Sequence, residues 1–230
     1  MIRRVLATFL LVAVMFFPLF VFATAQRGDI LLLKGKQYFI YTNPLRAYLV
    51  KNPGKLPKSE VISSSNWRGY VATWAVKDGR FVLTDISILQ SVHKPGEAGF
   101  STELRSVMLE MFPEQMEVVA DWFTGQVIVP DGKLVNYVHM GYASTYEKYI
   151  ILTVKNGVVI RDWTADTAAF IRFRDAQFAA YKKTDAYRAA LDEITQEEAE
   201  EKGMSAKQKE EFLREFYSET YMSIIFDEPH

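Results

Sequence analysis

Three carboxylates and one histidine are the side chains with which this chain could carry out acid–base chemistry: Asp85, Asp121, Glu147 and His139. Two carboxyl groups about 5 or 9 Å apart would suit glycoside hydrolysis. A histidine within hydrogen-bond reach of a carboxylate would suit general acid–base catalysis. The structural alternative is that Asp85 ends a strand, Asp121 accepts from a nearby backbone N–H, and His139 is an ordinary strand histidine. We favour this alternative, so we assign no catalytic residue and keep the four as candidates.

No sequence motif supports catalysis or cofactor binding. The histidines, His93, His139 and His230, are widely separated and form no metal-binding pair of the His-x-x-x-His or His-Glu-x-x-His type. The sequence also has no Gly-x-Ser-x-Gly nucleophile motif and no phosphate-binding glycine loop. The chain has no cysteine, which excludes disulfides, thiolate catalysis and cysteine-based zinc sites. We therefore predict no metal site and no cofactor.

Aromatic side chains provide the other route to function, which is binding. Tyr70 and Trp74 lie in one predicted hairpin, and Tyr142 and Tyr146 lie in the connection Gly141–Glu147. An aromatic sheet face can hold a protein partner, a peptide or a glycan, although strand aromatics are more often core residues. We expect Tyr142 and Tyr146 to be exposed, and we take all four aromatics as candidate partner-binding residues. The formal net charge of −1 argues against a nucleic-acid partner.

Three Asx-Gly pairs between apolar runs predict the hairpins that position these residues. The pairs are Asp78-Gly79, Asp131-Gly132 and Asn156-Gly157. Each suits a type I′ turn, which needs positive φ at both central residues. The sequence therefore predicts hairpins that span residues 67–89, 123–140 and 149–163.

The first hairpin also has a predicted register. A two-residue turn at Asp78-Gly79 places Trp74 opposite Leu83 and Ala72 opposite Asp85. Both faces of this ribbon are largely apolar, so we expect both to be covered. Two short strands, at residues 30–33 and 37–41, precede the hairpin.

The rest of the chain predicts helices. Residues 102–121 keep apolar residues at helical spacing, with an interruption at Pro113. A helix capped by Thr164 or Asp166 is expected to run to about Lys183. Ser205 begins a capping-box pattern that opens a last helix. Strands first and helices last favour an α+β fold, in which helices pack on an antiparallel sheet built from β-hairpins.

The N-terminus has the pattern of an export signal. Arg3 and Arg4 precede an uncharged apolar run that ends in Ala23-Thr24-Ala25, which predicts secretory cleavage after Ala25. The alternative is an uncleaved membrane anchor, because about 20 apolar residues can span a bilayer. Both interpretations place the rest of the chain outside the cytoplasm, in the periplasm or cell envelope. We divide that remainder into a β-rich domain at 26–163 and a helical segment at 164–230 of the same domain.

Three phrases of the sequence resemble a family of bacterial proteins of unassigned function. They are WRGYVATW at residues 67–74, ADWFTG at 120–125 and GYASTYE at 141–147. The resemblance covers residues 28–163. It implies the hairpin boundaries given above and adds no activity and no catalytic residue.

The sequence leads to one functional hypothesis and two alternatives. We expect an exported, non-enzymatic protein that binds a macromolecular partner in the cell envelope. The expected partner is another protein. An immunity protein that neutralises a toxin is one concrete form of this role. The first alternative is a hydrolase that acts on an envelope polymer through the four acid–base candidates. The second is a membrane-anchored structural subunit, which requires that residues 1–25 stay attached.

Overall fold

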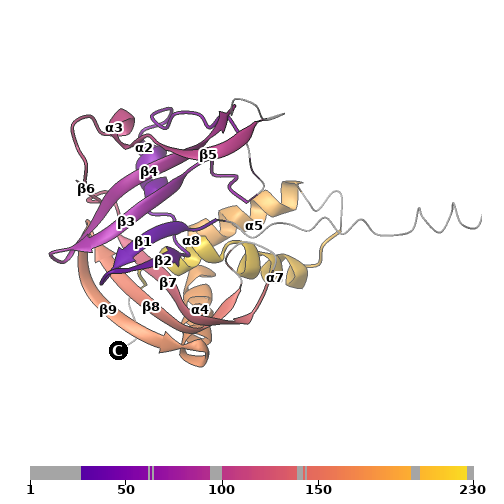
Figure 1. Ribbon diagram of the computed structural model, residues 1–230. Helices are drawn as coiled ribbons and strands as arrows, with labels where there is room; N and C mark the ends of the chain where they lie inside the picture. Colours follow the sequence, from indigo (N-terminus) through magenta and orange to yellow (C-terminus); the bar gives the residue numbers. More distant parts are fainter. Residues whose placement is uncertain are drawn as a thin grey trace, which may run out of the picture.

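A strongly curved β-sheet forms the body of the protein (Figure 1). Within the described residues it has nine strands, in the order β2-β1-β3-β4-β9-β8-β7, with β5 and β6 paired to β4. The strands are β1 (Asp29–Leu33), β2 (Lys36–Ile40), β3 (Val71–Lys77), β4 (Arg80–Val92), β5 (Ser101–Ser106), β6 (Val118–Val119), β7 (Gly125–Asn136), β8 (Thr145–Lys155) and β9 (Val158–Asp166).

The computed structural model describes residues 27–61, 63, 65–93, 100–138, 142, 144–197 and 203–226. The predicted export signal at 1–25 and the candidate His139 lie outside these ranges. Of the helices inside them, none combines the length and the apolar character that crossing a bilayer requires.

The sheet is antiparallel apart from one pair of strands. The strands β1 and β3 run parallel, and their register places Leu31 beside Trp74. They are joined by a long connection that contains β2 and the helix α2 (Leu45–Lys51), and a parallel crossover needs a connection of this length. The predicted α+β class, with a mainly antiparallel sheet and C-terminal helices, is confirmed.

The two edge strands of the sheet approach each other. The Tyr41 N–H, just after β2, donates to the carbonyl of Ile128 in β7 at 2.8 Å. The Thr42 hydroxyl accepts from the Ile128 N–H at 3.0 Å and donates to the Gln126 carbonyl at 3.1 Å. The sheet therefore curls almost into a barrel, and this contact covers part of both edges.

Two of the three predicted Asx-Gly turns are type I′ turns. Asp78 and Gly79 have φ of +49° and +72°, and Asn156 and Gly157 have φ of +48° and +74°. The two turns lie side by side, because the Phe81 N–H donates to the Gly157 carbonyl at 2.8 Å. The first and third predicted hairpins are confirmed, and they meet at their tips.

The remaining pair, Asp131-Gly132, lies inside β7, so the hairpin predicted at 123–140 is wrong. Gly132 has a φ of +79°, but Asp131 does not have the positive φ that a type I′ turn needs. The register of β7 against β8 shifts just after Asp131. The Glu147 carboxylate accepts from the Lys133 N–H at 3.0 Å and holds the extra residues as a β-bulge.

The hairpin of β3 and β4 keeps its predicted register only between Trp74 and the turn. Beyond that point Asp85 lies opposite Thr73, and not opposite Ala72 as expected. The cause is a bulge at Thr84, whose hydroxyl donates to the Thr73 carbonyl at 3.1 Å. One extra residue on a strand moves all later pairs by one position.

The helix predicted at 102–121 is wrong over most of its length. Residues 101–106 form β5, which pairs with β4 between Ser87 and Val92. A single helical turn, α3 (Met108–Met111), follows, and β6 then pairs with β4. The long strand β4 offers a ladder of backbone hydrogen bonds to this segment, and that pairing outweighs the helical spacing of its apolar residues.

The chain after β9 is helical and packs on β7 and β8. Its helices are α4 (Thr167–Tyr181), α5 (Asp185–Glu197), α7 (Ala206–Phe216) and α8 (Ser218–Ser223). Asp166 caps α4 by accepting from the Ala169 N–H at 2.7 Å, and Ser205 and Gln208 form the predicted capping box of α7. Both capping predictions are therefore confirmed.

Two hydrophobic clusters hold these layers together. The first fills the curved sheet, where the buried Trp74 stacks on Phe81 with ring centroids 4.8 Å apart. The second joins β7 and β8 to the helices and includes Tyr149 and Tyr221. The short helix α8 lies so close to β7 that a Cβ at Gly125 would be 2.6 Å from the Ser223 carbonyl oxygen. Only glycine fits at this contact.

Candidate functional site

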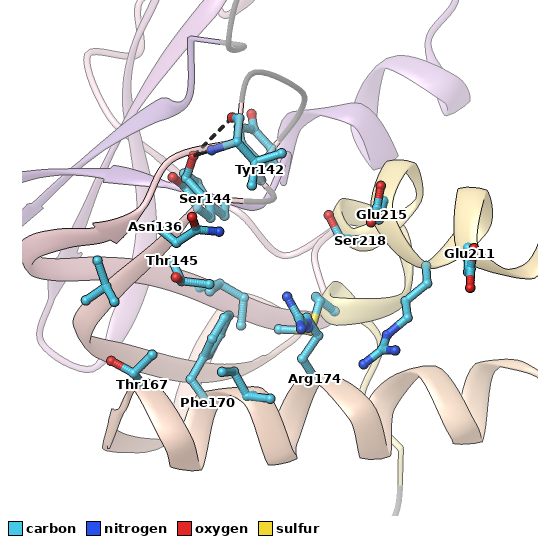
Figure 2. Close-up of a pocket in the computed structure, with 17 residues that line it drawn as sticks. Asn136, Tyr142, Ser144, Thr145, Thr167, Phe170, Arg174, Glu211, Glu215 and Ser218 are labelled. Atoms are coloured by element: carbon cyan, nitrogen blue, oxygen red, sulfur yellow. Dashed lines mark hydrogen bonds between the residues drawn. The ribbon is translucent and has the colours of Figure 1, made fainter.

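A groove of about 620 Å³ opens where the end of the sheet meets α4, α7 and α8 (Figure 2). Strand residues form one wall, α4 forms the floor, and α7 and α8 form the other wall. We name it the α4/α7 groove. Residues on its three sides include Tyr41, Val135, Tyr142, Phe170, Arg174, Glu211, Arg214, Glu215 and Met222.

Packed aromatic rings make up the apolar part of the groove. Tyr41 stacks on Tyr142 with ring centroids 4.6 Å apart, and Tyr146 meets Tyr41 edge-on at 6.1 Å. Phe170 stacks on the buried ring of Tyr149 at 3.5 Å. Rings fixed in this way offer a rigid apolar surface to an incoming side chain.

Two arginines give the groove a basic side. Arg214 on α7 pairs with Asp175 on α4, whereas Arg174 lies 3.9 Å from the same carboxylate. The Nε of Arg174 is buried and has no hydrogen-bond partner among the residues that the structure describes. Figure 2 shows Arg174 rising from α4 between the two walls. One carboxylate thus serves two guanidinium groups, and Arg174 keeps donors for an anion.

Two glutamates on α7 give the opposite charge. Glu211 lies 3.8 Å from Lys207, its neighbour one turn earlier on the helix. Glu215 lines the groove on the wall that faces the strands (Figure 2). The groove therefore offers a cation on its floor and an anion on its rim, on either side of an apolar surface.

A buried ion pair supports the strand wall of the groove. Arg68 Nη1 lies 3.0 Å from Asp29 Oδ1, and the two side chains are 6% and 0% exposed. Asp29 also accepts from the Trp74 indole N–H at 3.1 Å and from the Ala72 N–H at 3.2 Å. Both carboxylate oxygens are thus matched by donors, which is the condition for burying a charge.

Asn43 extends this pair to the groove and to the C-terminal helices. Its Oδ1 accepts from Arg68 and, at 3.2 Å, from the Tyr142 hydroxyl. Its Nδ2 donates to Glu219 on α8 at 2.8 Å. A continuous polar network therefore runs from β1 through the groove wall to α8.

Burial sets the ionisation of these groups. It raises the pKa of Asp29, and Arg68 and the two N–H donors act in the opposite direction. Burial would lower the pKa of Arg68, but the Asp29 carboxylate together with Tyr142 and Tyr70 outweighs this effect, and the pKa is raised. Burial also raises the pKa of Tyr41 and Tyr142. The groove tyrosines are therefore neutral hydrogen-bonding phenols at neutral pH.

The four predicted partner-binding aromatics are mostly interior. Tyr70 and Trp74 are 3% and 0% exposed, so they offer no surface to a partner. The prediction that Tyr142 is exposed is wrong, because it stacks on Tyr41 and is 7% exposed. Tyr142 still lines the groove with its edge, and Tyr146 is half-buried behind Tyr41.

The described acid–base candidates have separate structural surroundings. Asp85 accepts from two serine hydroxyls, Glu147 holds the β7 bulge, and Asp121 is exposed beside the β8–β9 turn. Asp85 lies on β4, Asp121 follows β6, which pairs with β4 only at Val82 and Leu83, and Glu147 lies on β8. None of the three lines the groove or the other two large cavities of the described residues. They do not form the carboxylate pair that glycoside hydrolysis needs.

Arg174 and Arg214 are site residues that the sequence interpretation missed. A usable signal is present for Arg174, which follows Phe170 by one helical turn and lies on the same buried stripe of α4 as Phe178 and Tyr181. A cation on an apolar stripe marks either a buried ion pair or a site. Arg214 gives no such signal, because charged residues surround it on α7.

No protein-family model matches the chain, and neither curated proteins nor solved structures give a significant match. The resemblance to a bacterial family therefore stays a prediction. The function has to be inferred from the geometry of the site.

Proposed function

We propose that this protein is a non-enzymatic binding protein of the cell envelope, and that the α4/α7 groove holds a segment of a protein partner. The observation that carries the proposal is Arg174, whose buried Nε makes no hydrogen bond and lies 3.9 Å from its nearest carboxylate, Asp175, beside the aromatic surface of the groove. A buried donor that lacks a hydrogen bond opposes folding by about 1–3 kcal/mol, and a partner's carboxylate beside the Arg174 guanidinium would offset part of that penalty. An immunity-type role in the envelope is one form of this function.

The groove defines the chemistry of the segment that fits. An apolar side chain packs against Tyr41 and Phe170, and a carboxylate next to it bonds to Arg174. A basic group of the same segment lies near Glu215 on the rim. This pattern of charges, rather than buried area, supplies the specificity of such contacts.

The end of β7 supports a protein as the partner. Leu134, Val135 and Tyr137 are 47%, 56% and 51% exposed, and Val135 lines the groove. A run of exposed apolar residues at a sheet edge is typical of an interaction surface. Because β7 ends the strand order, an extended segment can add its backbone to this edge.

Site-specific crosslinking tests the proposed function. A photoreactive phenylalanine analogue replaces Val135 in the full-length tagged chain, which is expressed in the producing cell. We expect crosslinks to a defined protein, and Arg174→Gln should lower their yield about tenfold, as loss of one charged hydrogen bond predicts.

Arg172→Gln is the matched control, because Arg172 is an exposed arginine on α4 outside the groove. Equal loss of crosslinks in both variants, or no loss in either, would refute the role of Arg174. The envelope location is tested separately by mass spectrometry of the mature protein, which should begin at Gln26. A mature chain that begins at Met1 would exclude cleavage.

A further inference from the structure

The β8–β9 turn contains the pair Asn156-Gly157, and an asparagine followed by glycine is the sequence most prone to lose its side-chain amide without an enzyme. The backbone nitrogen of Gly157 gives its proton to solvent and forms a C–N bond with Cγ of Asn156. The side-chain nitrogen takes up a proton and leaves as ammonia. Water then opens the succinimide ring at either carbonyl, which gives aspartate or isoaspartate. Glycine favours the attack because it has no side chain to hinder it.

The structure separates the two reacting groups by their surroundings. Asn156 is exposed, so water reaches its side-chain amide. Gly157 is buried, so its backbone nitrogen lies inside the contact between the turn and the segment that precedes β7. The reactive sequence is therefore present, but the attacking atom is covered.

Three hydrogen bonds hold the reacting atoms apart from the reaction. The Thr124 hydroxyl donates to Asn156 Oδ1 at 3.0 Å and accepts from the Asn156 N–H at 2.9 Å. The Gly157 N–H donates to the Phe123 carbonyl at 3.1 Å. The attacking nitrogen has to lose this proton and Cγ has to rotate towards it, so all three bonds oppose closure of the ring.

Packing leaves the backbone of the turn little room to change. A Cβ at Gly157 would lie 2.9 Å from the carbonyl atoms of Ala120 and 3.0 Å from the Asp121 nitrogen. The ring requires the backbone to rotate between Asn156 and Gly157, and the contact with Ala120 resists that rotation. The turn has to separate from residues 120–124 before the reaction can proceed.

The pair Asp78-Gly79 is a natural comparison within the same chain. It forms the same type I′ turn, with φ of +49° and +72°. Both residues are exposed, and Gly79 has open space around it. An aspartate there can form the same succinimide by loss of water, so the two turns differ in how far the fold covers them.

We propose that Asn156 is a deamidation site that Thr124 and the Phe123 carbonyl hold closed in the folded protein. The reaction follows local opening of the turn, so its rate is proportional to the population of the open state. The site shares no residue with the α4/α7 groove, and its test is independent of the proposed partner.

The modification makes a brief opening permanent. Conversion of Asn156 adds a carboxylate next to the segment that contains Asp121, and like charges repel. An isoaspartate also lengthens the main chain by one methylene group. The modified turn therefore cannot return to its contact with Ala120.

Peptide mass spectrometry of the full chain, incubated at neutral pH, tests the proposal. Asn156 should deamidate at least about tenfold more slowly in the folded protein than in guanidinium chloride, because the folded turn is mostly closed. Thr124→Val removes both bonds of the hydroxyl and should raise the rate in the folded protein about tenfold or more. Thr124→Ser keeps the hydroxyl and should keep the wild-type rate.

Isoaspartate at Asp78 is the internal control, since the Thr124 variants should leave its rate of formation unchanged. The comparison between folded and denatured wild-type protein needs no variant, so it decides the proposal even if Thr124→Val folds poorly. Equal deamidation of Asn156 in the folded and denatured chain would overturn the proposal. So would a folded Thr124→Val with the wild-type rate, or a Thr124→Ser that is as fast as Thr124→Val.

Discussion

Among single residues, Asp29 and Arg68 form the most deeply buried ion pair that the described residues contain. Each is almost fully buried, and each is the other's counter-ion. Their mutual attraction is balanced by the loss of water from both charges, so the intact pair adds little net stability. Removing only one partner is strongly destabilising, because the other charge stays buried without a counter-ion.

The first prediction concerns this pair. Arg68→Met should lower the free energy of unfolding by about 3–5 kcal/mol, and the double variant with Asp29→Leu should recover part of the loss. Urea denaturation of the purified proteins measures both values. Arg46→Met is the control, since Arg46 is 64% exposed and 3.8 Å from its partner Glu219, and it should cost less than about 1 kcal/mol. Equal losses for Arg68→Met and Arg46→Met would contradict the prediction.

At this scale the sequence predicts residue types better than residue roles. Trp74 is a strand aromatic, and its burial follows from the strand pattern alone. Tyr142 lies among Gly, Ser and Thr, which suggests exposure, but its ring is covered by Tyr41 from the other edge of the sheet. No local pattern contains that contact. Arg174 was partly predictable. Its position on the apolar stripe of a helix can be read from the sequence, but the groove that it lines cannot.

Among the secondary-structure elements, the β8–β9 turn packs tightly against the segment that follows β6. Gly157 has a φ of +74°, and a Cβ there would lie 2.9 Å from the carbonyl atoms of Ala120. Gly79 has nearly the same φ, +72°, but open space around it. A comparison of substitutions at the two glycines therefore distinguishes the cost of backbone strain from the cost of a steric clash.

The second prediction compares these glycines. Gly79→Ala should lower the free energy of unfolding by about 1–2 kcal/mol, which is the strain of a left-handed residue with a side chain. Gly157→Ala should cost that amount plus about 1–3 kcal/mol for the clash with Ala120. Thermal or urea unfolding of both variants gives the comparison. If the two losses are equal, Gly157 does not pack against Ala120 as described.

The third prediction concerns the bulge in β7. Glu147→Ala should lower the free energy of unfolding by about 0.5–1.5 kcal/mol, because the Lys133 N–H loses its acceptor. Glu147→Gln keeps an acceptor oxygen and should cost less. Lys148→Ala, at the exposed neighbouring position, is the control. Unchanged stability in Glu147→Ala would remove the structural role of this carboxylate and reopen a catalytic one.

Secondary-structure elements were predictable where residues close together in the sequence determine them. Asp78-Gly79 and Asn156-Gly157 make turns, and Asp166 and Ser205 cap helices, because each device acts within a few residues. Residues 101–106 and Asp131-Gly132 behave otherwise because a neighbouring strand supplies their partners. The helical spacing of residues 102–121 and the pair Asp131-Gly132 are local patterns. They contain no information about the backbone hydrogen bonds that β4 and β8 provide to these segments.

For the molecule as a whole, buried tyrosines couple stability to alkaline pH. Burial raises the pKa of Tyr149 and of Tyr221 to about 12, from an ordinary value of 10.0. Between these values an unfolded tyrosine releases its proton and a folded one keeps it. The unfolded state therefore binds fewer protons, and the free energy of unfolding falls as pH rises from about 10 to about 12.

The fourth prediction follows from that sign. The free energy of unfolding, measured by urea denaturation, should be constant from pH 8 to about 9.5 and should then fall by about 1.4 kcal/mol per pH unit for each buried tyrosine. Tyrosinate absorbance, recorded in parallel, should rise for the buried rings only when the protein unfolds. A midpoint that stays flat to pH 11.5 would show that these phenols ionise inside the folded protein.

The fold class was predictable from the order of strands and helices, but the closure of the sheet was not. It depends on Tyr41 meeting Ile128, and nothing near either residue in the sequence marks that pairing. The same holds for the α4/α7 groove, whose walls come from distant segments. Composition and periodicity describe elements, and the groove exists only once the elements are assembled.

The hydrogen bond between Asn43 and Glu219 constrains the order in which the fold can form. The two residues are 176 positions apart, so the β2–α2 connection that carries Asn43 is synthesised long before the helix that completes its network. At the usual pace of translation the interval is roughly 10–35 s. During that interval Asn43 lacks its partner Glu219, and contacts this distant in sequence form slowly even afterwards.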